Sequence, residues 1–395
     1  MTRNVNGLLL GAVGYCLYRT GMTYFYNEGM GIVGIGGGFV SDVWFVYATN
    51  LCACLTAVLV LAATYLGRAI SLSTMQWTAV GSIAAGIVAG YACVAAGVPS
   101  EAMQIPVGAL CGVALALLIF VWFDVFSSCP NVGSVLVQIA LGYLLYSMLS
   151  AGFDLVAGDF RLPLAFACVA VSGVIAMRCA PDNCPKSRAL SALPDRERSP
   201  LVSTSLCFFV FVGVVGLMHT SVLGSDYESV IASIPMWLTR VVTASVFVLI
   251  ACVLRARLKS SAIFRVVFPA LVIVLSLMPL LGDAYGTLAG GAVIVGYQVC
   301  GAVFFLYLVW ESCRLNISSR ELASFYILGS SAALLIGLTV GLLVQSVSSN
   351  FNLPLITLLA FVAAYPLILV SRLIPRKRRR WLLAIDTADE KASAT

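Results

Sequence analysis

Basic side chains inside apolar stretches are the residues of this sequence best suited to do chemistry. Arg19 and Arg240 each lie within a long apolar stretch, and His219, the only histidine, lies within another. A charged side chain inside a membrane costs about 2.5–3.5 kcal/mol or more, so it usually faces a partner or a wet cavity. Together these three residues predict an electropositive cavity that binds an anionic or strongly polar ligand.

Uncharged polar residues near these positions are candidates for the wall of that cavity. Tyr15, Tyr18 and Thr20 lie close to Arg19 in the sequence. Other candidates within apolar stretches are Gln138, Gln298, Tyr143, Tyr146 and Tyr297. Side chains of this kind also form hydrogen bonds between membrane helices, so both roles stay open.

The basic residues have second interpretations. Arg19 can also extend its long side chain to the outer interface. The three aromatic residues from Tyr24 onward do not mark where the apolar stretch ends, so the interface could lie close to Arg19. His219 titrates near neutral pH and could sense protons, or it could stay neutral and form a hydrogen bond between helices. The sequence does not decide between these alternatives.

Two acidic residues at the ends of apolar stretches predict a gate. Asp124 and Glu311 each lie beside a tryptophan, which is typical of the aromatic belt at a membrane interface. Ion pairs from these acids to Arg68 and to Arg255 or Arg257 across the inner face would hold an outward-open state. The other interpretation of both acids is a solvated helix end.

Membrane-spanning helices must position these residues. Of the 395 residues, 61% are hydrophobic and 10% are charged, and the mean hydropathy is +1.02. A membrane span takes roughly 20 mostly apolar residues. Twelve such stretches lie at 7–26, 43–67, 77–97, 106–126, 133–156, 162–179, 201–223, 231–254, 263–282, 287–310, 323–346 and 353–373. The sequence therefore predicts an all-α polytopic membrane protein.

The positive charges alternate with these stretches and predict the orientation. If the N-terminus is cytoplasmic, Arg161 alone of the 23 Lys and Arg residues lies outside, and Arg19 and Arg240 lie within spans. All the others lie on the cytoplasmic side, as the positive-inside rule requires. We expect an inner (cytoplasmic) membrane protein with both termini in the cytoplasm. The basic run 376–380 would attract anionic lipid, so the net charge of +6 needs no nucleic acid partner.

The spans divide into two similar halves. The stretch from Cys111 to Asp124 reads CGVALALLIFVWFD, and the stretch from Cys300 to Glu311 reads CGAVFFLYLVWE. This echo, and a basic residue followed by threonine in the first span of each half, support a parallel duplication. We expect a six-helix bundle at 1–179, a cytoplasmic linker at 180–200, a second six-helix bundle at 201–374 and a basic tail at 375–395.

Several function classes find no support in the sequence. The 13 cysteines are scattered through the spans or lie on the inner side, so neither a disulfide framework nor a zinc site is expected. We expect no catalytic residues, no metal and no cofactor, because no nucleophile set, nucleotide-binding loop or metal cluster is present. No carboxylate lies in the middle of a span, so the usual group for proton or sodium coupling is missing.

The twelve spans and paired halves resemble the major facilitator superfamily of transporters. After the second span that family has a Gly-Asp-Arg-Gly-Arg type signature, whereas this chain has LGRA at 66–69, without the aspartate. A closer likeness, over 1–375, is to the membrane half of LuxR-type regulators from anaerobic actinobacteria. It rests on VWFD at 121–124, VWE at 309–311 and the basic residue in the first span.

The two resemblances imply different functions. The regulator resemblance implies a domain that senses a small molecule and precedes a cytoplasmic helix-turn-helix. Only the fourteen residues 382–395 follow Trp381, which is too few for such a domain. We therefore expect a ligand-sensing membrane domain that lacks its DNA-binding part. The alternative is a transporter that moves a small organic solute through the same cavity. The lipid bilayer and that small ligand are the expected partners.

Overall fold

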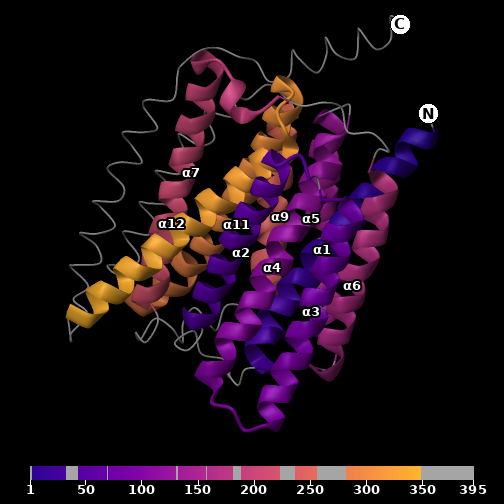
Figure 1. Cartoon of the computed structure of the whole chain (residues 1–395). Helices are drawn as coiled ribbons and strands as arrows, with labels where there is room; N and C mark the ends of the chain where they lie inside the picture. Colours follow the sequence, from indigo (N-terminus) through magenta and orange to yellow (C-terminus); the bar gives the residue numbers. More distant parts are fainter. Residues whose placement is uncertain are drawn as a thin grey trace, which may run out of the picture.

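Helices make up almost all of the described structure, which is a computed structural model (Figure 1). It describes residues 2–32, 43–68, 70–129, 132–156, 158–180, 188–222, 236–255 and 282–347. The α-helices are α1 (Thr2–Ile32), α2 (Val43–Tyr65), α3 (Leu72–Ala95), α4 (Ser100–Ser127), α5 (Val132–Asp154), α6 (Gly158–Cys179), α7 (Asp195–Val222), α9 (Met236–Arg255), α11 (Gly282–Leu315) and α12 (Ser319–Val347). One 3-10 turn, η2 (Leu190–Ala192), precedes α7.

The chain is an all-α polytopic membrane protein, as the sequence predicts. Eight of the described helices, α2 to α7 together with α11 and α12, are long and apolar enough to cross a membrane. Large apolar side chains point away from the protein, for example Leu59 at 68% exposure and Phe160 at 67%. A soluble protein would bury such residues, whereas lipid tails cover them in a membrane.

Ten of the twelve predicted spans each coincide with one described helix. The predicted spans 263–282 and 353–373 lie outside the described residues, apart from Gly282, and so does the tail 375–395. The count of twelve spans and the division into two halves therefore stay predictions. Of the predicted linker 180–200, residues 195–200 already form the start of α7.

Two glycines and a serine mark where α2 and α3 end and where α3 begins, at the short connections between helices. Gly67 and Gly97 have φ of +70° and +66°, a conformation that suits glycine and that ends α2 and α3. Ser71 caps α3, and its hydroxyl accepts a hydrogen bond from the Thr74 amide at 3.0 Å. These sharp turns let long apolar helices run antiparallel to their neighbours.

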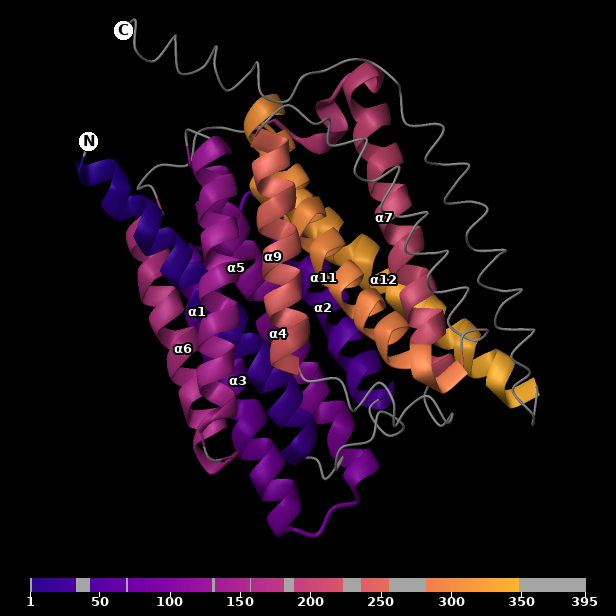
Figure 2. The ribbon, with the colours of Figure 1, turned by 180° about the vertical axis from the view of Figure 1, so that it is seen from behind.

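The N-terminal group of described helices, α1 to α6, meets the C-terminal group, α7 to α12, mainly along two seams. Within the N-terminal part, α1 packs on α5 and α6, and α4 packs on α2 and α3. Helix α12 packs on α7. The seams are α2 against α12 and α5 against α9. Both views show α12 converging with the N-terminal helices at its first residues and diverging from α6 toward its last (Figures 1 and 2).

Small residues let α2 and α4 approach closely. A Cβ atom at Gly108 would lie 2.6 Å from the Phe45 carbonyl oxygen, and one at Gly112 would lie 2.1 Å from the Thr49 carbonyl oxygen. The Thr49 hydroxyl also donates a hydrogen bond to the Gly108 carbonyl at 3.0 Å. Glycines four residues apart are a common way for membrane helices to make backbone contact.

The substitution Gly112→Ala is expected to destabilise the protein by about 1–3 kcal/mol, because the added methyl group overpacks a backbone contact. Thermal unfolding of the purified protein in detergent measures this as a lower Tm. The matched control is Gly81→Ala in α3, where an added Cβ meets nothing within 4 Å. Equal Tm values for the two variants would contradict the tight α2–α4 contact.

Candidate functional site

Arg19 of α1 lies among tyrosine side chains. Its guanidinium carbon is 5.3 Å from the ring centroid of Tyr143 and 5.9 Å from that of Tyr146, both on α5. The Nε atom is buried without a hydrogen-bond partner among the described residues. Among the same residues, ion pairs join Asp124, Asp195 and Glu311 to other arginines, and none includes Arg19. Among the described residues, the groups that stabilise this positive charge are therefore aromatic rings and phenol dipoles.

A cavity of about 230 Å³ lies against Arg19. Its wall comes from α1, α2, α4, α5, α7, α11 and α12, so it lies between the N-terminal helices and the C-terminal helices. The polar wall residues other than Arg19 and the tyrosines are Asn50, Gln298, Ser330 and Ser331. A cavity between the helices of a bundle is a usual place for a small-molecule site.

Aromatic side chains form most of the remaining wall. Tyr18 stacks on Trp122 with ring centroids 6.3 Å apart and an interplanar angle of 23°. Tyr15 lies 5.7 Å from Trp122 and 6.4 Å from Phe305, measured between ring centroids. The Trp122 indole N–H donates to the Ser172 hydroxyl at 3.2 Å, which fixes the ring in place. Tyr143, Phe208, Tyr297 and Tyr326 also line the cavity.

The structure thus brings five predicted wall residues to the cavity, where they lie together with Arg19: Tyr15, Tyr18, Tyr143, Tyr297 and Gln298. It places others elsewhere. Thr20 is fully buried and does not line the cavity. Gln138 is 6% exposed and packs against α1, where its Oε1 lies 2.8 Å from the position of a Cβ built at Gly11. His219 lies in α7, but its side chain is outside the described residues.

Arg240 of α9 does not line the cavity that holds Arg19. It is 2% exposed, its Nη1 atom donates to the Tyr24 hydroxyl at 2.7 Å, and its guanidinium carbon lies 4.8 Å from the centre of that ring. Tyr24 in turn donates to the Ser150 carbonyl at 2.8 Å. This chain of contacts joins α9 to α1 and α5, so Arg240 holds the α5–α9 seam.

We expect Arg240→Ala to act on stability, with a loss of about 1.5–3 kcal/mol from the charged hydrogen bond. The Kd for a ligand of the cavity should change less than twofold, since Arg240 does not line the cavity. Thermal unfolding and calorimetric titration measure the two effects, with Arg178→Ala at the exposed end of α6 as the control. A large rise in Kd with an unchanged Tm would instead make Arg240 a ligand anchor.

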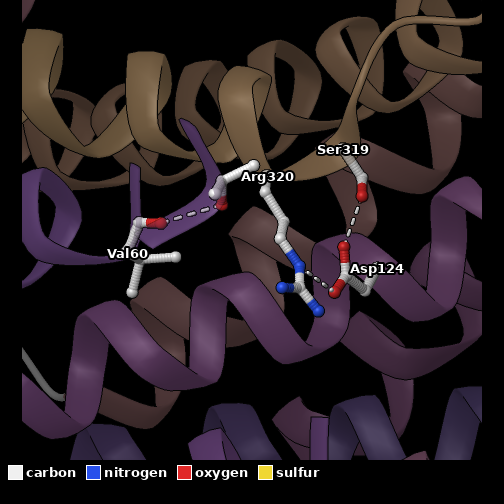
Figure 3. Close-up of polar contacts among 5 residues, drawn as sticks. Val60, Asp124, Ser319 and Arg320 are labelled. Atoms are coloured by element: carbon white, nitrogen blue, oxygen red, sulfur yellow. Dashed lines mark hydrogen bonds and ion pairs between the residues drawn. The ribbon is translucent and has the colours of Figure 1, made fainter. Parts of the chain in front are cut away.

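A buried polar contact joins α4 to α12 at the end of the bundle that the sequence predicts to face the cytoplasm. Asp124 accepts a hydrogen bond from the Ser319 hydroxyl, and its Oδ2 atom lies 3.4 Å from Nε of Arg320 (Figure 3). The side chains of Asp124 and Arg320 are 6% and 17% exposed. Nearby, the Cys313 thiol donates to the Ser127 carbonyl at 3.3 Å. These contacts join the first turn of α12 and the end of α11 to the end of α4.

The predicted gate partners are different in the structure. Asp124 pairs with Arg320 rather than with Arg68, which is exposed after the end of α2. Glu311 pairs with Arg314 on its own helix, at 2.6 Å between Oε2 and Nη2. Arg255 is the last residue of α9, and its side chain lies outside the described residues. Ion pairs three residues apart on one helix are local, so the Glu311–Arg314 pair does not bridge the two groups.

The linker before α7 also contacts the inner end. The Arg188 amide donates to the Asn316 carbonyl at 2.7 Å, and the Ser318 amide donates to the Arg188 carbonyl at 3.0 Å. The Leu190 amide donates to the Glu321 carboxylate of α12. These contacts hold the linker against the turn between α11 and α12, directly beside the Asp124–Arg320 pair.

The sequence alone does not single out every residue of the site. Trp122, predicted as part of the interfacial belt, has no solvent exposure and lines the cavity instead. Trp310 is 7% exposed, and the Arg314 guanidinium carbon lies 5.1 Å from the centre of its ring. Phe305 and Tyr326 were not distinguished from other apolar residues. The one available signal was the aromatic content of the stretches around Arg19 and Trp122.

Several solved structures with a similar arrangement of helices are membrane transporters. A bacterial homologue of the iron transporter ferroportin, in an outward-facing state with soaked iron, has a TM-score of 0.63 at 15% identity. The alignment covers 94% of this chain and 99% of that chain. This chain has the fold of the major facilitator superfamily.

Two further structures agree. The human organic anion transporter MFSD10 has a TM-score of 0.57 at 14% identity, with 93% of this chain and 99% of that chain covered. A variant of the Escherichia coli fucose:proton symporter FucP has a TM-score of 0.55 at 11% identity, with 94% and 99% covered. No protein-family model and no curated protein sequence matches the chain.

Proposed function

We propose that this chain is a major-facilitator-type transporter that moves a small organic anion across the inner membrane, with both termini in the cytoplasm. The observation that carries this proposal is Arg19. It is a permanently charged residue in the wall of a cavity between the two groups of helices, and no described carboxylate pairs with it. An unneutralised charge in such a place is costly, and an anionic solute would neutralise it.

The contact between α4 and α12 supports a carrier mechanism. In alternating access, two helical groups rock about a central site so that one end is closed while the other is open. Here the Asp124–Ser319–Arg320 contact joins α4 to α12 at the predicted cytoplasmic end. This contact fits a state in which the solute site is shut off from the cytoplasm.

The sensing domain that the sequence also suggested finds no support in these observations. The solved structures named above are all transporters, and no contact in the described residues favours a regulator over a carrier. Binding without transport is therefore the outcome that an experiment must exclude. The neighbours' names, which mention iron, organic anions and fucose, do not identify the solute of this chain.

Uptake into proteoliposomes at pH 7 tests the proposal. The probes are radiolabelled solutes of similar size that are monoanions, dianions, cations or neutral molecules. Saturable uptake of an anion, faster than into protein-free liposomes and lost in Arg19→Ala, is the expected result. If an anion binds the purified protein but no probe crosses faster than the leak, the chain is a sensor and the proposal is wrong.

A further inference from the structure

We propose that the solute is a planar aromatic monocarboxylate, an inference that rests on the proposed transport through this cavity. Two independent features of the wall point to this class. One is the single positive charge of Arg19, and the other is the aromatic character of the surfaces around it. The small volume of the cavity sets the size of the solute.

The charge of the wall selects a monoanion. Among the described residues that line the cavity, Arg19 alone carries a charge. One carboxylate neutralises it, whereas a dianion would leave an extra negative charge in a poorly hydrated site. A phosphate monoester carries a charge of about −1.5 to −2 near pH 7 and is disfavoured for the same reason. The planar guanidinium also matches the two oxygens of a carboxylate better than a single point charge would.

Phenol groups around Arg19 can complete the carboxylate site. Tyr18 and Tyr143 both line the cavity, and Arg19 lies over the Tyr143 ring. Phenolic hydroxyl groups donate hydrogen bonds to carboxylate oxygens. A ring face, by contrast, repels an anion and attracts the positive edge of another aromatic ring. The wall therefore offers a carboxylate site at Arg19 and an aromatic site beside it.

The aromatic site is rigid and preformed. Tyr18 and Trp122 are stacked, and Trp122 donates a hydrogen bond to Ser172. Tyr15 contacts both Trp122, edge-on, and Phe305, in a stacked arrangement. These rings are 4% exposed or less, apart from Phe305 at 7%. Fixed rings favour a flat partner that can stack or meet them edge-on, over a puckered ring of equal size.

The cavity admits only a small molecule. Its volume of about 230 Å³ is below the range of about 300–1,000 Å³ that is usual for drug-sized ligands. A single six-membered ring with one carboxylate and a short substituent fits that limit. Gln298 lies in the wall, and its Oε1 atom has no hydrogen-bond partner among the described residues, so it can accept a bond from a hydroxyl or amino substituent.

Calorimetric titration of the purified full chain tests the class with four probes. Benzoate is the reference, cyclohexanecarboxylate removes the π system, benzamide removes the charge, and phthalate adds a second charge. We expect benzoate to bind at least tenfold more tightly than benzamide and phthalate, and at least threefold more tightly than cyclohexanecarboxylate. Tyr18→Leu should bring the benzoate and cyclohexanecarboxylate affinities together, whereas Arg178→Gln at an exposed site should change neither.

The outcomes separate this inference from the proposed function. If benzamide or cyclohexanecarboxylate binds as tightly as benzoate to the wild-type protein, the inferred class is wrong. If benzoate does not bind but another anion in the uptake panel crosses the membrane, the class is also wrong and the transporter proposal stands. If no probe binds and none crosses, both proposals are wrong. The comparison among probes uses the wild-type chain, so it does not depend on whether a variant folds.

Discussion

Arg19→Ala is expected to reduce anion transport at least about 30-fold, because truncating one partner of a buried hydrogen-bonded charge pair costs about 2–5 kcal/mol. Arg19 is the one charged residue among the described residues of the cavity wall, so no other described side chain can replace it there. Initial uptake rates in proteoliposomes, measured over a range of solute concentrations, give the effect on kcat/KM.

Arg19→Ala should affect stability differently from transport. In the empty protein the Arg19 charge has no carboxylate partner among the described residues, so its removal should leave the Tm unchanged or raise it. Arg19→Lys keeps the charge but loses the planar guanidinium that can donate two parallel hydrogen bonds to a carboxylate. Its transport rate should therefore lie between those of the wild type and Arg19→Ala. Arg178→Gln removes an exposed arginine and serves as the matched control. A variant Arg19→Ala with a wild-type rate would show that the charge does not bind the solute.

Asp124→Asn is expected to open the inner end of the bundle. Removing one partner of a buried ion pair costs about 3–5 kcal/mol, which is enough to shift a two-state equilibrium by about 100-fold or more. Cys313 is a natural reporter, because it is half-buried beside this contact and donates to the Ser127 carbonyl. Its alkylation by a membrane-impermeant maleimide in inside-out vesicles should speed up at least about tenfold, since alkylation follows the open population.

Two controls make this result specific to the Asp124–Arg320 pair. Arg198→Gln breaks an ion pair with Asp195 whose side chains are 49% and 91% exposed, so it should not change the labelling of Cys313. The double exchange, in which Asp124→Arg is combined with Arg320→Asp, should restore slow labelling at least in part. Mass spectrometry of the Cys313 peptide gives the rates. Unchanged labelling in Asp124→Asn would mean that this contact does not hold the inner end closed.

The local sequence is sufficient to predict the helices and part of the cavity wall. Long apolar stretches have few alternatives to membrane helices, because a bilayer leaves no other way to satisfy the backbone. Arg19 and Tyr18 could be predicted because they are neighbours in the sequence and stand out chemically from their apolar surroundings. Tyr143 and Tyr297 were predicted as polar residues within spans, and they do line the cavity.

The tertiary pairing could not be predicted in the same way. Arg68 and Arg320 were both expected on the cytoplasmic side, and only the packing of α12 against α2 and α4 brings Arg320 to Asp124. The sequence also does not show which neighbouring helices an arginine within an apolar stretch contacts. Arg240 therefore looked like a cavity residue but donates to Tyr24 at the α5–α9 seam. Trp122 looked interfacial for the same reason, because its burial depends on helices distant in sequence.

Counterflow in proteoliposomes tests the central claim most directly. Vesicles are loaded with a high concentration of an unlabelled anion that the protein binds, and a trace of the same labelled anion is added outside. A carrier with one central site exposed alternately to each side predicts transient accumulation of label above equilibrium, absent in Arg19→Ala and retained in Arg178→Gln. Label that only equilibrates at the rate of protein-free vesicles, despite binding to the protein, would contradict transport.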